Sequence, residues 1–161
     1  MPTQIEEEGI KETVIPQQGT LKGVSVGFYD RDINEVFMRY LALENALLDS
    51  DVLLVQKEAE KIAGIDAAIL GKQMQATAKL MSLTKANNKQ RDFFVTLTQE
   101  MEKLIVASKI EYGTVYKHFC DTALDGVGAF WLSVEKTSKN PYKTNSSVDC
   151  KVTTELLNLG L

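Results

Sequence analysis

The residues of this chain that are best suited to chemistry lie in its last third. His118 is the only histidine of the protein, and Cys120 and Cys150 are its only cysteines. His118 and Cys120 are two positions apart, so in a strand their side chains face the same way. Thiolate and imidazole groups are ligands for Cu(I) and Zn(II). The three residues His118, Cys120 and Cys150 are therefore a candidate metal site.

The two cysteines also allow a structural interpretation. In an oxidising compartment they can form a disulfide that closes a loop of about 30 residues, which is worth ~3–4 kcal/mol in the chain-entropy model. Otherwise they can be small buried apolar side chains. Spacing alone does not choose between a metal site, a disulfide and two buried thiols.

A Cys–His nucleophile pair is the enzymatic alternative, and the sequence argues against it. Nothing near His118 would orient its imidazole, and no glycine-rich oxyanion loop is visible. Neighbours two positions apart on a strand rarely come within hydrogen-bonding reach, which a nucleophile and its base require. We therefore expect no enzyme, no catalytic residue and no cofactor-binding residue.

Composition and charge restrict the class of protein. The chain has 161 residues, of which 44% are hydrophobic and 25% charged, as in an ordinary folded domain. Its net charge is −4 and no cluster of Lys and Arg is longer than a pair, which argues against a nucleic-acid partner. No stretch approaches the roughly 18–20 apolar residues of a membrane span.

The first part of the chain differs in composition from the rest. Residues 1–28 are polar, acidic and rich in Gly and Pro, so we expect a tail or linker there and a single domain over residues 29–161. A short strand over Leu21–Val26 is the alternative. The N-terminus lacks the basic and apolar regions of a signal peptide, so we expect a cytosolic protein or one whose signal has been removed.

Two amphipathic helices are predicted after this segment. Asp32 and Glu35 are spaced as a capping box, which predicts that the first helix begins at Asp32. Asp51 is a suitable cap for the second helix, and Gly64 is well placed to end it. Both segments carry apolar residues at steps of three and four, which indicates one buried face.

Two further helices follow the same pattern. The third is predicted over Asp66 to about Thr84, with a weaker apolar stripe that Gly71 interrupts. Asn87 and Gln90 are spaced to cap the fourth helix, whose apolar repeat is regular.

Four helices with short connections favour antiparallel neighbours, so the predicted fold is mainly α, an up-and-down four-helix bundle. The apolar stripes are interpreted as core. A di-iron centre is excluded, because it needs two Glu-x-x-His pairs and the chain has one histidine.

After Gly113 the periodicity changes to alternation, which indicates strands. We predict a small C-terminal antiparallel β-hairpin or ribbon over about residues 114–155, packed against the bundle. The pair Asp125–Gly126 suits a hairpin turn, and Asn140–Tyr142 marks a second turn whose tyrosine ring packs beneath it. A lone hairpin is marginal in water, so the aromatic residues around Trp131 must be partly buried.

Taken together, these C-terminal residues resemble the DUF3347 family of Bacteroidetes cell-envelope proteins. The similarity covers about residues 33–155. Its specific part lies in the β element, and the segments Tyr40–Asp51 and Gln90–Thr98 add a weaker helical match. The residues that carry the specific part are Tyr116, Cys120, Ala123, Asp125, Gly126, Gly128–Ser133, Asn140–Tyr142 and Cys150.

The resemblance implies a periplasmic or cell-envelope location. Some members of the family accompany adaptor subunits of heavy-metal efflux systems or copper-handling proteins, which implies a protein partner in the envelope or the metal-efflux machinery and a soft ion, Cu(I) or Zn(II), as the metal. The chain departs from the family pattern at Cys120–Thr122, where the family has Cys-Pro-Met. Ser147 stands near where the family has a second methionine, and Phe119 separates His118 from Cys120.

Two functions follow from the sequence. The first is a non-catalytic envelope accessory module that handles or senses a soft metal through His118, Cys120 and Cys150. The second is a structural protein-interaction domain whose cysteines are bridged or buried and which binds no metal.

Overall fold

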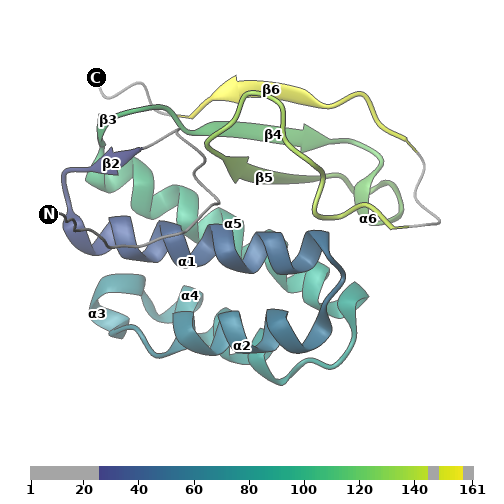
Figure 1. Cartoon of the computed structure of the whole chain (residues 1–161), viewed down its shortest axis with the longest axis horizontal. Helices are drawn as coiled ribbons and strands as arrows, with labels where there is room; N and C mark the ends of the chain where they lie inside the picture. The colour runs from purple at the N-terminus through teal and green to yellow at the C-terminus, as the bar shows by residue number, and fades with distance from the viewer. Residues whose placement is uncertain (1–25, 145–148, 158–161) are drawn as a thin grey trace, which may run out of the picture.

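The structure, a computed structural model, describes residues 26–144 and 149–157 (Figure 1). In this part of the chain the fold is mainly helical, with several helices and two small antiparallel sheets. The larger sheet lies on one side of the helices, with strand β5 nearest to them (Figure 1). Nearly all of the predicted tail 1–28 and of the alternative strand Leu21–Val26 lies outside the described residues.

Helix α1 spans Arg31–Leu48, and its cap differs from the prediction. The backbone of Asp30 is extended, and its carboxylate accepts a hydrogen bond from the N–H of Asp32 at 2.9 Å. Asp32 is therefore already inside the helix, and the predicted start at Asp32 is wrong. Asp30 and Asp32 are both acidic and could each accept from the free N–H groups of a first turn. In the structure Asp30, the earlier of the two, is the cap.

Helix α2 spans Val52–Ala63 and confirms its predicted cap. The carboxylate of Asp51 accepts from the N–H of Leu54 at 3.0 Å. Gly64 ends the helix as predicted. Its φ is −80°, so it does not adopt the left-handed conformation for which glycine is usually preferred at the end of a helix.

The predicted third helix is two helices, α3 over Ala67–Leu70 and α4 over Lys72–Leu83. Gly71 separates them with φ +85° and ψ 150°, a conformation that is essentially restricted to glycine. The prediction of one continuous helix is therefore wrong at the residue that weakened its stripe.

Helix α5 spans Asn87–Ser108, and the predicted capping box is absent. Instead, the Asn87 side chain donates to Gln90 at 2.8 Å, and Gln90 donates to the carbonyl oxygens of Val52 and Thr84 at 3.2 and 3.0 Å. The buried Gln90 amide thus joins the starts of α2 and α5 to the end of α4. That use of its side chain depends on tertiary contacts, which local spacing does not show.

The four longer helices contact one another in sequence order. α1 packs on α2 and α5, α2 packs on α4, and α4 packs on α5. The apolar stripe of α1 is buried, and a polar residue, Glu44, is buried with it. The buried apolar residues of this helix are Ile33, Val36, Phe37, Tyr40, Leu41, Leu43, Ala46 and Leu47.

The larger sheet has strands β4 (Tyr116–Cys120), β5 (Ala129–Ser133) and β6 (Thr153–Leu156) in the order β5–β4–β6, all antiparallel. The predicted turn at Asp125–Gly126 is a short helical turn, α6 over Ala123–Gly126, in which Leu124 and Asp125 have positive φ. The longer connection therefore replaces the predicted tight hairpin.

The smaller sheet was not predicted. β2 (Gly27–Phe28) pairs with β3 (Ile110–Tyr112), which directly follows α5. A strand of two residues is too short for alternation to reveal it. The pairing brings the segment before α1 to the segment after α5.

Two tyrosine hydroxyls satisfy the outer edge of β5. The N–H of Leu132 donates to the Tyr40 hydroxyl at 3.1 Å, and the Tyr142 hydroxyl donates to the carbonyl oxygen of Phe130 at 2.8 Å. Tyr40 also forms a 2.8 Å hydrogen bond with Thr98 of α5. An edge strand leaves these backbone groups unpaired. Tyr40 therefore joins the sheet to α1, and Tyr142 joins it to the turn at residues 140–142.

We predict that Tyr40→Phe lowers the free energy of unfolding by ~1–3 kcal/mol, because the buried N–H of Leu132 loses its acceptor. Urea unfolding followed by circular dichroism measures the change. Tyr29→Phe is the matched control, since Tyr29 is 63% exposed and should leave stability unchanged. Equal stability of Tyr40→Phe and the wild type would contradict the proposed role of this hydroxyl.

Candidate functional site

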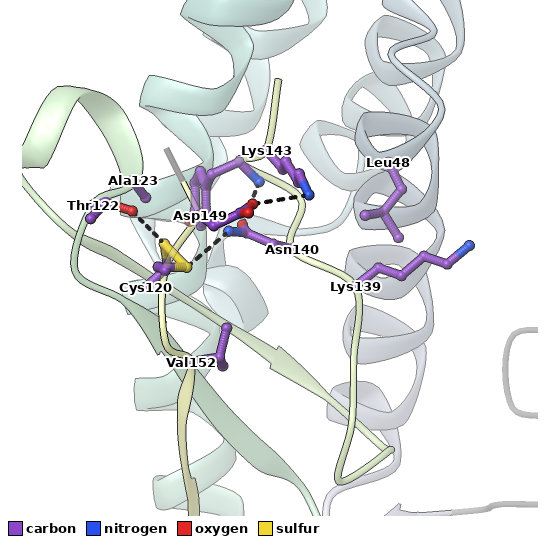
Figure 2. A pocket seen from close by; sticks show the side chains of 11 residues that line it. Leu48, Cys120, Thr122, Ala123, Lys139, Asn140, Lys143, Asp149 and Val152 are labelled. Atoms are coloured by element: carbon purple, nitrogen blue, oxygen red, sulfur yellow. Dashed lines mark hydrogen bonds and ion pairs between the residues drawn. A yellow bond between two sulfur atoms is a disulfide. The ribbon is translucent and has the colours of Figure 1, made fainter. Parts of the chain in front are cut away.

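The two cysteines are joined in a disulfide between the end of β4 and the segment before β6 (Figure 2). The Cα atoms of Cys120 and Cys150 are 5.6 Å apart. Cys120 is buried, whereas Cys150 is half-buried. Two polar side chains approach the sulfur atoms, Thr122 at 3.4 Å from Cys120 and Asn140 at 3.9 Å from Cys150.

The disulfide lines a pocket of about 470 Å³ (Figure 2). Its walls come from the end of α1, from α6 and from residues 134–143, which we call the strap. An ion pair of 3.5 Å between Lys143 and Asp149 lies beside the disulfide. The pocket is lined by Leu48, Cys120, Thr122, Ala123, Lys139, Asn140, Tyr142, Lys143, Asp149, Cys150 and Val152.

His118 is buried in the middle of the sheet, with 1% of its surface exposed. Its register partners are Trp131 on β5 and Thr154 on β6. One ring nitrogen, Nε2, lies 2.7 Å from the Ser133 hydroxyl, and Nδ1 lies 2.8 Å from the Thr154 hydroxyl. The imidazole therefore links all three strands, and both of its nitrogens have a partner within the protein.

Burial lowers the pKa of His118 below its usual value, because the charged imidazolium is poorly solvated there, and the backbone of Glu135 only partly opposes this effect. The Trp131 ring stacks on the imidazole with ring centres 5.3 Å apart. The neutral imidazole is thus held between an aromatic ring and two hydroxyls.

The spacing argument correctly predicted one feature of the candidate metal site. His118 and Cys120 are both buried on alternate positions of β4, as residues that share a face. The sulfur atoms of Cys120 and Cys150 are bonded to each other in this structure, whereas the thiolate is the form of cysteine that binds a metal. Within residues 26–144 and 149–157, no group of three His, Cys, Asp or Glu side chains could hold a metal ion.

Arg91 is a site residue that the sequence analysis missed. Its guanidinium is buried and donates to the carbonyl oxygen of Pro141 at 2.9 Å, to that of Leu47 at 3.2 Å and to the Ser50 hydroxyl at 3.0 Å. Burial lowers the pKa of Arg91. These contacts fix the strap to the turn between α1 and α2 and so shape the pocket.

A signal for the missed residues is present in the helical pattern. Arg91 lies three residues before Phe94, and Glu44 lies four after Tyr40, so each polar residue occupies a position on a buried apolar stripe. A charged residue at such a position is rarely buried without a partner or a role. Searching the stripes for charged members would have identified both.

Comparison with known proteins identifies no relative: no family model, no curated protein and no solved structure matches the chain. Among the helices of the described residues, none has the length and apolar character needed to cross a membrane.

We predict that the double variant Cys120→Ala/Cys150→Ala loses ~3–4 kcal/mol of unfolding free energy, because the 30-residue separation closes a long loop in the unfolded chain. Denaturant unfolding with and without a reductant measures this. The reductant should destabilise the wild type by a similar amount and leave the double variant unchanged. Equal stability of the oxidised wild type and the double variant would disprove the stabilising role of the bond.

We predict that His118 makes the protein less stable in mild acid. The unfolded histidine has a pKa of about 6.5 and the folded one a lower value, so the unfolded state binds more protons between the two. Stability contributed by the neutral imidazole is therefore complete above pH ~6.5 and falls on acidification by at most ~1.4 kcal/mol per pH unit. Unfolding curves from pH 7.5 to 5 for the wild type and His118→Gln isolate this slope as their difference. Parallel pH profiles would refute the assignment, as would an NMR titration midpoint of the imidazole above 6.5.

Proposed function

We propose that the chain is a non-catalytic module of the cell envelope, a structural protein-interaction domain whose fold is closed by the Cys120–Cys150 disulfide. The disulfide is the observation that carries the proposal. Disulfides form and persist in oxidising compartments, including the periplasm, and are rare in the cytosol. The bond therefore supports a periplasmic or cell-envelope location.

The surroundings of His118 support a role without catalysis. A general base needs a ring nitrogen within reach of a substrate proton, and here both nitrogens contact Ser133 and Thr154 inside the sheet. The same contacts fix the register of β4 against β5 and β6. We therefore assign His118 and its contacts with Ser133 and Thr154 to structure rather than to chemistry.

A surface feature supports the interaction with a protein partner. Leu53 of α2 and Leu83 of α4 are 75% and 65% exposed and line one hollow between the two helices. Large apolar side chains that share an exposed hollow are more frequent at binding surfaces than elsewhere on a soluble domain.

We also propose that α1, α2, α4 and α5 form an up-and-down four-helix bundle. The closed series of contacts, in which each helix packs on its sequence neighbour and α5 packs back on α1, supports this topology.

The resemblance to the DUF3347 family remains part of the proposal. The residues that carry it lie together in space: the Tyr142 ring contacts Trp131 with centres 6.2 Å apart, its hydroxyl binds the backbone of Phe130, and Asn140 approaches Cys150. A shared motif that builds one packed unit is what a common fold requires.

Thiol counting and metal titration test the proposed function against the metal-handling alternative. We expect no free thiol in the native protein and no uptake of Cu(I) or Zn(II) by the oxidised form. The reduced wild type and Cys120→Ala/Cys150→Ala are then titrated in parallel. Two free thiols in the native protein, together with one ion bound per reduced chain and none by the variant, would overturn the proposal in favour of a site at His118, Cys120 and Cys150.

A further inference from the structure

Glu44 is a buried carboxyl group without a full set of partners. It lies on α1 and is 4% exposed. In the part of the chain that the structure describes, its Oε2 is the only buried side-chain oxygen or nitrogen that has no hydrogen-bond partner. A buried polar atom left in this state destabilises the fold, so its presence needs a reason.

Glu44 lines a cleft between α1 and the strap. This cleft is a different cavity from the disulfide pocket. The cleft has a volume of about 740 Å³, within the range of pockets that hold small ligands. Ser133 on β5 also lines the cleft, and its hydroxyl contacts His118. The full lining is Leu41, Glu44, Asn45, Leu48, Asp49, Ser133, Val134, Glu135, Thr137, Ser138 and Lys139.

The charges of this lining favour a cationic ligand. The lining includes the carboxylates of Asp49 and Glu135 and the buried carboxyl of Glu44, against one ammonium group, that of Lys139. Asn45 and the hydroxyls of the strap add hydrogen-bonding groups, and the leucines add apolar surface. A ligand with a short apolar body and a charged N–H donor group would complement all three features.

The protein's own cations do not fill this role. The guanidinium of Arg91 is directed to carbonyl oxygens of Leu47 and Pro141, and no ion pair to Glu44 is present among the described residues. A divalent metal is disfavoured as well, because no group of three acidic or imidazole ligands converges within the described ranges.

We propose that the cleft between α1 and the strap binds a small organic cation, an alkylammonium or alkylguanidinium group, with the Glu44 carboxylate as its counter-ion. The inference goes beyond the proposed function, which needs no ligand in this cleft. The cation can be a free amine or the Lys or Arg side chain of a protein partner, since both present the same chemistry.

Binding is coupled to a proton. Burial raises the pKa of Glu44 well above its usual value, and a hydrogen bond with Tyr40 only partly opposes this, so burial favours the protonated acid in the empty cleft. A bound cation favours the carboxylate, so the acid gives one proton to the solvent as the ion pair forms. The groups packed around this region that also carry or can carry charge are Tyr40, Asp49, Arg91, His118, Glu135, Lys139 and Tyr142.

NMR titration of the native, oxidised protein with n-butylammonium and n-butylguanidinium tests the proposal. Saturable shifts of backbone amides confined to the cleft are expected, together with a change of the Glu44 carboxyl carbon from the acid to the carboxylate position. Neutral n-butanol, which has nearly the same shape, should not bind. Equal binding of n-butanol, or the absence of saturable binding by both cations, would overturn the proposal without any variant.

Glu44→Gln keeps the shape of the side chain and removes its negative charge. We expect it to weaken binding of both cations at least about tenfold. Glu35→Gln is the matched control on the same helix, because Glu35 forms only an exposed pair with Arg39, and it should bind like the wild type. Unchanged affinity of Glu44→Gln would refute the role of the carboxylate. Blocked lysine and arginine (N-acetyl, N-methylamide) form the last arm: binding at least as tight as the free amines assigns the site to a protein partner, and weaker binding assigns it to a free amine.

Discussion

The fold depends on how the outer edge of β5 is satisfied. The N–H of Leu132 and the carbonyl group of Phe130 point away from the sheet, where another strand would normally pair with them. The hydroxyls of Tyr40 and Tyr142 take that place. Because Tyr40 comes from α1 and also holds Thr98 of α5, one hydroxyl joins two helices and the sheet. Packing against helices stabilises a small sheet, and this hydroxyl helps to hold the three strands there.

The second tyrosine makes the strap part of the same connection. Tyr142 reaches β5 from residues 134–143, and Trp131 donates to Ser138 of the same segment at 3.1 Å. Arg91 holds the strap from the helical side. The strap therefore cannot move from the helices without breaking the edge of the sheet. Leu48 and Lys139 line both the disulfide pocket and the Glu44 cleft, so the strap shapes two cavities at once.

The sequence predicted those features that depend on local physics. Apolar spacing predicted the helices, Asp51 predicted a cap, and alternation predicted strands around His118 and Trp131. Gly71 interrupts the apolar stripe of the predicted third helix, but spacing alone does not show that its backbone separates two helices. The capping of α5 could not be predicted in the same way, since Gln90 contacts Val52 and Thr84 of other elements. For the candidate site, spacing placed His118 and Cys120 on one face. It could not decide whether Cys150 reaches Cys120, because that depends on where β6 pairs with β4.

The burial of Glu44 is best understood through its neighbours on α1. Leu43 and Leu47 continue the apolar stripe on either side, so a leucine at position 44 would fill the same face without a desolvated carboxyl. The raised pKa of Glu44 means that the folded state holds a proton that the unfolded chain releases. This residue therefore lowers the stability of the fold as the pH rises above the ordinary pKa of a glutamate side chain. Tyr40 lies one turn earlier on α1, and its hydroxyl contacts Leu132 and Thr98. The hydrogen bond with Tyr40 only partly offsets the cost of burying the carboxyl, and a cation in the cleft is the further partner that we propose for it.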